Sequence, residues 1–395
     1  MNSPAETSTT IWSRNFILIS LSNALLFAGF HLLLPTLPLF IEAYGATSTQ
    51  IGLIVGGFTF SAIGIRLFTS AGILRWGHRH FLQIGLLICI LSMASYYFTS
   101  QVSATLLVRL AHGMGFGIAS TLFATLAVGL IPANRRGEGM GYFSLGSTFV
   151  MVLAPLVGLW LYTTFLAKGL FIAGTILQAL SFIIVYFISF EEHLSIQTHT
   201  DQASPFSVSQ VLLPCIFSFL LGICIGGVMS FITLLAQEQH FANPGLFFLV
   251  SMSCVFLVRT FSGRVYDQFG APWVIAPASL SLLLSMFSLF TGSTSFLVAA
   301  VFYGIGLGAL FPALQTWVIQ LAPQEKQSTA SATFYNAVDT GIGGGSIILG
   351  YIVEGQSYTA VYFVTSCISF SFFSSYLLYL VYLWRKRTLK ETQVV

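Results

Sequence analysis

Residues 258–270 form the stretch VRTFSGRVYDQFG, which places three charged side chains in an otherwise apolar chain. A diverged copy, IRLFTSAGILRWG, occupies residues 65–77 with the same spacing from Arg to Gly. In that copy, Leu74 stands where the first stretch has Asp267. Such a repeat predicts a chain built from two related halves, an organisation typical of membrane transporters.

The repeat extends beyond this loop. HGMGFG at 112–117 matches YGIGLG at 303–308, and Pro132 and Pro323 follow at the same offset. The longest polar interruption of the chain, 191–210, lies between the two halves. The predicted organisation is an N-terminal six-helix bundle, a cytoplasmic linker and a C-terminal six-helix bundle: 1–190, 191–210 and 211–395.

The composition is that of a membrane protein. Hydrophobic residues make up 56% of the chain and charged residues 7%, with a mean hydropathy of +0.87. A water-soluble domain could not cover its surface with so few charged groups. The apolar runs are about twenty residues long, enough for a helix to cross a bilayer. The predicted spans are 16–41, 51–69, 81–100, 104–131, 140–163, 168–189, 211–235, 245–265, 273–291, 296–321, 329–353 and 360–384.

The Lys and Arg residues predict the orientation of the spans, because cationic loops resist translocation. With the N-terminus inside, the outer loops receive only Lys168, and Arg109 is left within a span. Both termini are therefore expected to be cytoplasmic. The other basic residues fall on the inner face: Arg14, Arg66, Arg75, Arg79, Arg135, Arg136, Arg259, Arg264, Lys326, Arg385, Lys386, Arg387 and Lys390.

Several function classes are disfavoured by the motifs that the sequence lacks. The five Cys residues are scattered singly through apolar spans, so no metal site and no cofactor is expected. Neither the ATP-binding GxxxxGK(S/T) motif nor an HExxH motif occurs, which argues against an ATP-driven pump and against an enzyme. The net charge of +3 follows from membrane topology and does not indicate nucleic-acid binding.

The repeated loop resembles a signature of the major facilitator superfamily, G-x-x-x-D-x-x-G followed by basic residues. GRVYDQFG at 263–270 fits this pattern, although the basic pair that usually follows is missing. In the first half, SAGILRWGHRH keeps Gly77 and basic residues but has Leu74 for the acid. The resemblance covers essentially the whole chain. It implies an all-α polytopic membrane protein with twelve transmembrane helices in two six-helix, pseudo-symmetric bundles.

Two further motifs support the resemblance. The fourth span carries RLAHG where the family has R-x-x-Q-G, so that His112 stands at the usual Gln position. The fifth span matches in part the motif of drug and metabolite antiporters, through Gly141, Pro155 and Gly158. The phrases LLLPTLPLF and NPGLFF resemble bacterial efflux members, including metallophore exporters.

The two loop stretches are predicted to form a cytoplasmic gate. A loop carboxylate can accept hydrogen bonds at a neighbouring helix start and pair with Arg, which holds two bundles closed until it breaks. Asp267 is expected to form such a clasp with Arg264 and Arg259, whereas Leu74 leaves the first-half clasp weakened or dependent on another acid. The alternative is that these residues only anchor the interface and enforce topology. The nearest replacement acids by topology are Glu138 and Glu325. The predicted gate residues are Arg66, Arg75, Gly77, Arg79, Arg259, Gly263, Arg264, Asp267 and Gly270.

Charged and titratable groups inside the spans are candidates for proton coupling. Arg109 and His112 lie three residues apart and so share a helix face. A permanent charge there is costly unless it meets a wet cavity or a partner, and His112 can titrate near neutral pH. Asp339 sits mid-span, as suits a proton carrier. The alternatives are that Arg109 snorkels to the outer interface, that His112 is a packing residue, and that Asp339 makes a structural hydrogen bond.

By resemblance, the first, fourth, seventh and tenth helices line a central substrate cavity. A lone polar side chain in a membrane helix often only holds helices together, which is the alternative at each position. The candidate substrate contacts are Asn23, His31, Arg109, His112, Ser230, Tyr303 and Gln315.

These features predict a secondary transporter that exports a small organic molecule (drug, metabolite or metallophore) in exchange for protons by alternating access. The partial antiporter motif favours export, and proton-coupled import of a sugar, organic acid or other small nutrient is the alternative. A non-transporting sensor on a transporter scaffold is a third class. The expected partners are the small-molecule substrate, protons and the lipid bilayer, for a monomer in the bacterial cytoplasmic (inner) membrane.

Overall fold

The structure is a computed structural model, in which every regular element of the described residues is a helix. The described residues are 11–132, 135–189, 211–241, 243–292, 296–323 and 326–392. The predicted linker 191–210 and the candidate acid Glu325 lie outside them.

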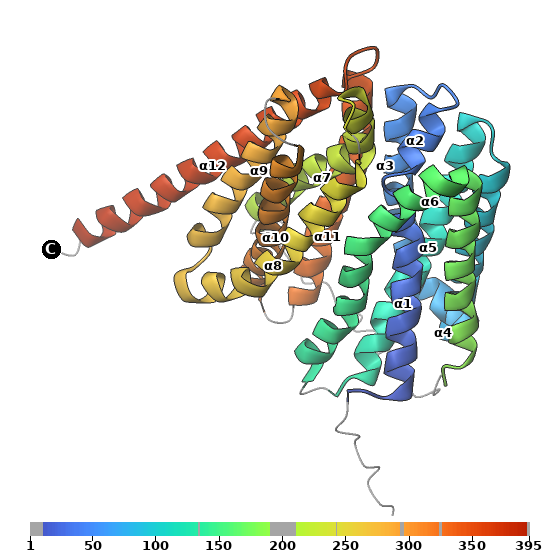
Figure 1. Ribbon diagram of the computed structural model, residues 1–395. Helices are drawn as coiled ribbons and strands as arrows, with labels where there is room; N and C mark the ends of the chain where they lie inside the picture. The colour runs from blue at the N-terminus through green and yellow to red at the C-terminus, as the bar shows by residue number, and fades with distance from the viewer. Residues whose placement is uncertain are drawn as a thin grey trace, which may run out of the picture. The chain divides into compact units, whose positions relative to one another are not determined.

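Figure 1 shows the helices in chain order. They are α1 (Arg14–Leu33), α2 (Leu37–Glu42), α3 (Ser48–Arg66), α4 (Thr69–Ser95), the short 3-10 helix η1 (Tyr96–Phe98), α5 (Val102–Leu130), α6 (Arg136–Tyr186), α7 (Leu212–Glu238), α8 (Gly245–Phe269), α9 (Pro272–Thr291), α10 (Phe296–Gln320), α11 (Gln327–Ile352) and α12 (Thr359–Thr392).

Ten helical segments of the described chain are long and apolar enough to cross a membrane. One of them, Glu138–Tyr186, has 49 residues, and its helix α6 is interrupted at Leu166, with φ 59° and ψ −175°. Figure 1 shows α6 as two limbs, in agreement with the predicted spans 140–163 and 168–189. Counting both limbs and adding α11, which is too polar to be among the ten, gives the twelve predicted spans.

The chain divides into two compact units, Met1–Gly45 with Gly57–Ser204, and Ala46–Gly56 with Pro205–Val395. The start of α3 is grouped with the second unit, where its glycine face meets backbone. A Cβ on Gly52 would lie 2.1 Å from the carbonyl oxygen of Ser346. The predicted boundary between the halves stays a prediction, because it falls on the linker.

In the first unit, the motif HGMGFG places glycines of α5 against two neighbouring helices. A Cβ on Gly113 or Gly117 would lie 2.4 or 2.7 Å from a carbonyl oxygen of α3. One on Gly115 would lie 2.7 Å from a carbonyl oxygen of α4. Since a real Cβ does not fit at these distances, the three glycines allow α5 to pack backbone to backbone on both sides.

The second unit repeats this contact with YGIGLG. A Cβ on Gly304 would lie 2.3 Å from a carbonyl oxygen of α8, and one on Gly308 would lie 3.0 Å from a Cα of α8. One on Gly306 would lie 3.0 Å from a backbone nitrogen of α9. The sequence repeat therefore encodes one packing arrangement twice, with α5 against α3 and α4, and α10 against α8 and α9.

The repeated loop has a glycine in the same unusual conformation in both units. Gly77 has φ 70° and ψ 164°, and Gly270 has φ 87° and ψ 172°. This region of backbone space is open almost only to glycine. The loop geometry thus accounts for a Gly in both copies, although the acid is present only in the second.

Replacing Gly270 with alanine is expected to lower the free energy of unfolding by about 1–3 kcal/mol, because a Cβ is strained in this conformation. The matched control is Gly263→Ala, where a Cβ would meet no atom within 4 Å. In that helical position alanine is expected to stabilise by up to about 1 kcal/mol. Thermal unfolding of both variants in one detergent measures the difference. Equal melting temperatures would show that the backbone conformation at residue 270 does not strain an alanine.

Candidate functional site

Helix α5 carries a buried cation in the first unit. Arg109 is 1% exposed and His112 is fully buried. The guanidinium carbon of Arg109 lies 4.2 Å from the ring centre of Phe58 on α3 and 5.7 Å from that of Phe30 on α1. Aromatic faces stabilise a desolvated guanidinium by cation–π attraction. They supply no hydrogen-bond acceptor in the plane of its N–H groups.

Two further buried side chains complete this site. His112 Nε2 lies 3.1 Å from the amide nitrogen of Gln178 on α6. The ring of Tyr96, at the start of η1, is 6.0 Å from the His112 ring, and its hydroxyl lies beside the Arg109 guanidinium. Tyr96 and Gln178 are both fully buried. We call Arg109, His112, Tyr96 and Gln178 the arginine cluster.

The arginine cluster holds polar atoms that have no hydrogen-bond partner among the described residues. They are Nε and Nη1 of Arg109, Nδ1 of His112, the Tyr96 hydroxyl and Oε1 of Gln178. Leaving such groups unpaired in the interior costs free energy, most of all for the charged one. Apart from Glu138, the sequence has no Asp or Glu between residues 43 and 190. The helices from α3 to α6 therefore offer almost no acid to neutralise Arg109.

As placed here, the amide nitrogen of Gln178 donates to His112 Nε2, so the imidazole proton sits on Nδ1. Arg109, His112 and Tyr96 then present donors, while Gln178 presents one acceptor, Oε1. Such a set can bind a group that accepts hydrogen bonds next to one that donates a hydrogen bond.

Two other candidates of the first unit lie on α1. His31 is 6% exposed, its Nδ1 has no partner among the described residues, and its ring is 5.1 Å from that of Phe30. Phe30 also borders Arg109, so the structure brings His31 near the arginine cluster. Asn23 is buried about two turns earlier on the same helix.

In the second unit, the structure brings several candidates together between α10 and α11. The amide nitrogen of Gln315 lies 3.3 Å from the Tyr335 hydroxyl and 3.4 Å from that of Ser331. Asp339 is half-buried and follows Tyr335 by four residues, hence on the same face of α11. Gln315, Tyr335 and Asp339 therefore form a polar face on these two helices.

The remaining two cavity candidates lie in helix contacts of the second unit. Ser230 donates a hydrogen bond to the Ser346 hydroxyl at 2.9 Å, which ties α7 to α11. Ser346 in turn donates to the Ile342 carbonyl at 2.8 Å. Tyr303 is 2% exposed, with its ring centre 5.8 Å from that of Phe247. Both environments match the alternative of helix packing that the sequence left open.

The first gate loop has its basic residues on aromatic rings. The guanidinium carbon of Arg75 lies 5.1 Å from the Trp76 ring centre, and that of Arg79 lies 5.8 Å from the Tyr186 ring centre. Leu74, at the position of the missing acid, is 79% exposed. Arg66 is half-buried at the last position of α3.

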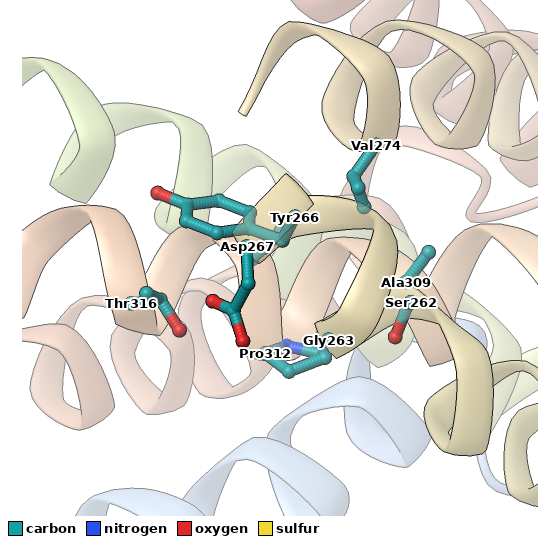
Figure 2. Close-up of a pocket in the computed structure, with 9 residues that line it drawn as sticks. Ser262, Gly263, Tyr266, Asp267, Val274, Ala309, Pro312 and Thr316 are labelled. Carbon is teal, nitrogen blue, oxygen red and sulfur yellow. The ribbon is translucent and has the colours of Figure 1, made fainter. Parts of the chain in front are cut away.

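The second gate loop does not form the predicted clasp in this structure. Asp267 and Arg264 are both exposed, and no ion pair joins them in the part of the chain described. Arg259 lies over the Phe311 ring, at 5.7 Å. Figure 2 shows Asp267 near Pro312 of α10. Whether the clasp forms in another state of the protein remains a prediction.

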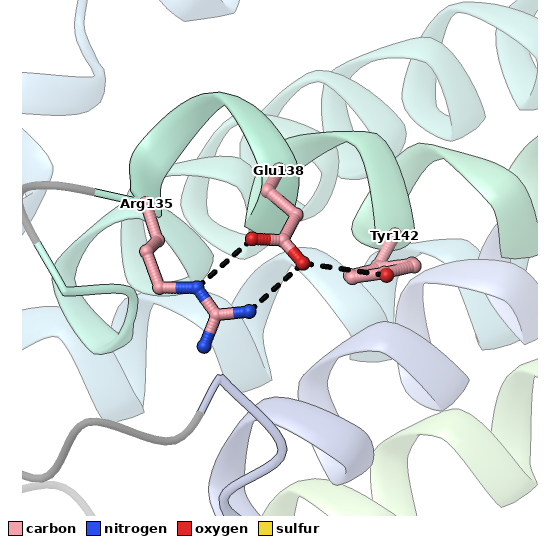
Figure 3. A network of polar contacts seen from close by, with 3 residues as sticks. All are labelled: Arg135, Glu138 and Tyr142. Carbon is pink, nitrogen blue, oxygen red and sulfur yellow. Dashed lines mark hydrogen bonds and ion pairs between the residues drawn. The ribbon is translucent and has the colours of Figure 1, made fainter.

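Glu138, a predicted replacement for the missing acid, already has a partner. It accepts two hydrogen bonds of 2.9 Å from Arg135 and one of 3.4 Å from the Tyr142 hydroxyl (Figure 3). This bidentate pair closes the first turn of α6 on itself. The pair supplies no carboxylate to the gate loop in this structure.

The fifth-span motif serves helix packing where the structure describes it. A Cβ on Gly158 would lie 2.4 Å from the Leu32 carbonyl oxygen, so this glycine lets α6 approach α1. Pro155 is buried inside α6. Gly141 is exposed, with open space where a Cβ would be.

Sequence reasoning missed Tyr96, Gln178 and Phe58 as parts of the site. Gln178 was detectable as the only amide side chain in the apolar run from 168 to 189. Tyr96 and Phe58 gave no such signal, because the chain is 15% aromatic and most of its rings pack or face lipid.

Ten described segments that are long and apolar enough to cross a membrane, a duplicated helix-packing motif and buried polar side chains within the helices define a polytopic membrane transporter rather than an enzyme. The chain belongs to the Major Facilitator Superfamily, whose sequence profile matches residues 19–261 and 245–394.

Known proteins agree with this assignment. The staphylopine export protein of Staphylococcus aureus is 24% identical over 369 residues, which cover 88% of this chain and 92% of that protein. The multi-drug resistance efflux pump PmrA of Streptococcus pneumoniae is 24% identical over 381 residues, which cover 91% of this chain and 94% of that protein. Among solved structures, the nucleoside transporter NupG superimposes with a TM-score of 0.76 at 15% identity, covering 92% of this chain and 99% of that one. The structural match supports the fold.

Proposed function

We propose that the protein exports a small organic molecule in exchange for protons by alternating access. Two of its relatives are named for export or efflux, and the partial antiporter motif of the fifth span favours the same direction. The cargo class is a drug, a metabolite or a metallophore. The proposal places a monomer in the bacterial cytoplasmic membrane, with both termini in the cytoplasm.

The observation that supports this proposal most strongly is the arginine cluster. Arg109 is a buried cation whose Nε and Nη1 have no hydrogen-bond partner among the described residues. An acidic or carbonyl group on the cargo would supply the acceptors that this guanidinium lacks, and would lower the free energy of the loaded site.

His112 and Gln178 give the cluster two states. With His112 neutral, Gln178 donates to the ring and its Oε1 is left to accept a hydrogen bond from the cargo. Protonated His112 has donors on both nitrogens, so Gln178 must turn its Oε1 toward the ring. A proton and a hydrogen-bond donor of the cargo would thus compete for the same oxygen, as exchange requires. A cargo with both an acidic group and a donor group, such as a zwitterion, fits this site.

The experiment uses purified protein in liposomes with an imposed pH gradient and a trapped pH dye. Zwitterionic metallophores, cationic drugs, sugars and organic acids are added in turn. Cargo-triggered proton flux antiparallel to the cargo is expected, largest for zwitterions. Flux parallel to the cargo would overturn export and establish proton-coupled import. Absence of flux with every compound would favour a sensor.

Asp339 provides a test of coupling in the second unit. Asp339→Asn keeps the shape of the side chain and removes its proton, so proton movement is expected to fall to the protein-free level while membrane insertion is unchanged. The matched control is Glu238→Gln, which removes a carboxylate that accepts a hydrogen bond from the Tyr358 N–H at the end of α7. Wild-type flux in Asp339→Asn would remove Asp339 from the coupling role.

A further inference from the structure

Two adjoining cavities lie in the second unit where α8 turns into α9. The larger has a volume of about 510 Å³ and the smaller about 40 Å³. Tyr266 and Asp267 line both, so the two cavities share a wall. We call the larger one the Asp267 cavity. Its volume falls in the range of small-molecule sites, which runs from about 300 to 1,000 Å³.

One side of the Asp267 cavity is an aromatic wall formed by Trp317, Tyr376 and Tyr379. The ring centre of Trp317 lies 5.5 Å from that of Tyr379 and 6.0 Å from that of Tyr376. These rings support one another, and Tyr376 is 1% exposed. The wall is therefore a packed surface of α10 and α12.

Asp267 also lines this cavity. Asp267 makes no hydrogen bond or ion pair with any described residue, and Arg264, one turn earlier, is exposed to solvent. The Tyr266 hydroxyl donates to Oε1 of Gln320 at 3.0 Å, which joins α8 to α10 beside the cavity. Tyr266 is thereby held in place, and the Asp267 carboxylate is left available to a ligand.

The small cavity adds a polar recess next to this acid. It is lined by Ser262 and Thr316 (Figure 2), and the buried hydroxyl of Ser262 has no partner among the described residues. A space of about 40 Å³ holds ordered water but no organic group. The recess can hydrate the carboxylate without occupying the larger cavity.

We propose that the Asp267 cavity binds an organic cation with an alkylated ammonium head and a compact apolar body. A carboxylate attracts the charge, and faces of Trp and Tyr attract the polarised methyl groups around it. A carboxylate ligand would be repelled by the negative charge of Asp267. This site shares no residue with the arginine cluster, and its existence does not depend on export.

A free ammonium compound and the headgroup of a lipid share this chemistry. The test uses full-length protein in nanodiscs of phosphatidylglycerol, which has no cationic headgroup, and calorimetric titration with benzyltrimethylammonium. Saturable binding at one site is expected. Asp267→Asn and Trp317→Leu are each expected to weaken binding about tenfold or more.

Three controls test whether binding depends on the charge of residue 267, on the aromatic wall and on the cationic head of the probe. Asp267→Glu retains the charge and is expected to bind within a few-fold of wild type, and each variant must keep the wild-type melting temperature. Trp273→Leu removes an exposed Trp (69%) outside the cavity and is expected to bind normally. Benzyl alcohol, which has the ring without the charge, is expected not to displace the probe.

The outcomes separate the two sources of the ligand. If discs containing phosphatidylcholine, whose headgroup is a trimethylated ammonium, show weaker probe binding, the natural occupant is a lipid headgroup, and if binding is unchanged it is a free ammonium compound. Absence of saturable binding, or equal affinity in wild type, Asp267→Asn and Trp317→Leu, would overturn the proposal. Displacement by benzyl alcohol would overturn the requirement for a cation.

Discussion

Arg109→Met is expected to abolish cargo-dependent proton flux while leaving the protein at least as stable as wild type. Methionine has a similar reach and no charge, so it removes an unpaired buried cation and keeps the packing against Phe58 and Phe30. Replacing buried charges by apolar groups often stabilises by about 1–4 kcal/mol. Transport is expected to fall about 100-fold or more, because at least two charge-assisted hydrogen bonds to the cargo are lost.

Transport is expected to fall in Arg109→Met while stability stays the same or rises. This combination distinguishes a role of Arg109 in transport from a role in holding the fold together. Flux in liposomes and thermal unfolding in detergent are measured on the same preparation. Lys168→Met, which removes an exposed cation lying 5.3 Å from the Tyr97 ring, is expected to transport normally. A variant Arg109→Met that unfolds at lower temperature would show a structural role. One that regains full flux at saturating cargo would show a role in binding alone.

Gly304→Ala is expected to lower the free energy of unfolding by about 3 kcal/mol, near the upper limit for overpacking a helix contact. The new Cβ would lie 2.3 Å from the Ser251 carbonyl oxygen, so α10 and α8 must separate. Gly64→Ala is the control, because a Cβ on Gly64 of α3 has no neighbour within 4 Å. There alanine is expected to stabilise by about 1 kcal/mol through its higher helix propensity.

The same substitution is thus expected to act with opposite sign at two glycines. Melting temperatures measured side by side in one detergent test this. If both variants shift in the same direction, the close approach of α10 to α8 does not limit stability. Gly113→Ala, the equivalent position in the first unit, is expected to behave like Gly304→Ala, since its Cβ would lie 2.4 Å from the Phe58 carbonyl oxygen.

Much of the fold could be predicted because membrane insertion depends on composition. Apolar runs of about twenty residues specify spans almost independently of tertiary contacts. The interruption of the long helix α6 at Leu166 falls between the predicted spans 140–163 and 168–189. The glycine run of α11 allows close packing at Gly341, where a Cβ would lie 2.3 Å from the Phe219 carbonyl oxygen.

The candidate site was less accessible to sequence reasoning, because it depends on which face of each helix is turned inward. The spacing of Arg109 and His112 placed them on one face of α5. It gave no indication that Gln178 of α6 would meet His112. Ser230 has the polarity of a cavity residue, yet it forms a hydrogen bond to Ser346 of α11. Which side chains of different helices contact one another is determined by helix packing, and a single sequence does not reveal that packing.

The glycines of α5 and α10 have a consequence for motion. Because α5 contacts backbone atoms of α3 and α4 in alternation, rotating it about its own axis would drive side chains into carbonyl groups. Residues 57–66 of α3 with α4 and α5, and the triplet α8–α9–α10, should therefore each move as a rigid body, with little internal sliding. The rigid element of this chain is then expected to be a block of three packed helices, used twice, and bending is expected outside these blocks.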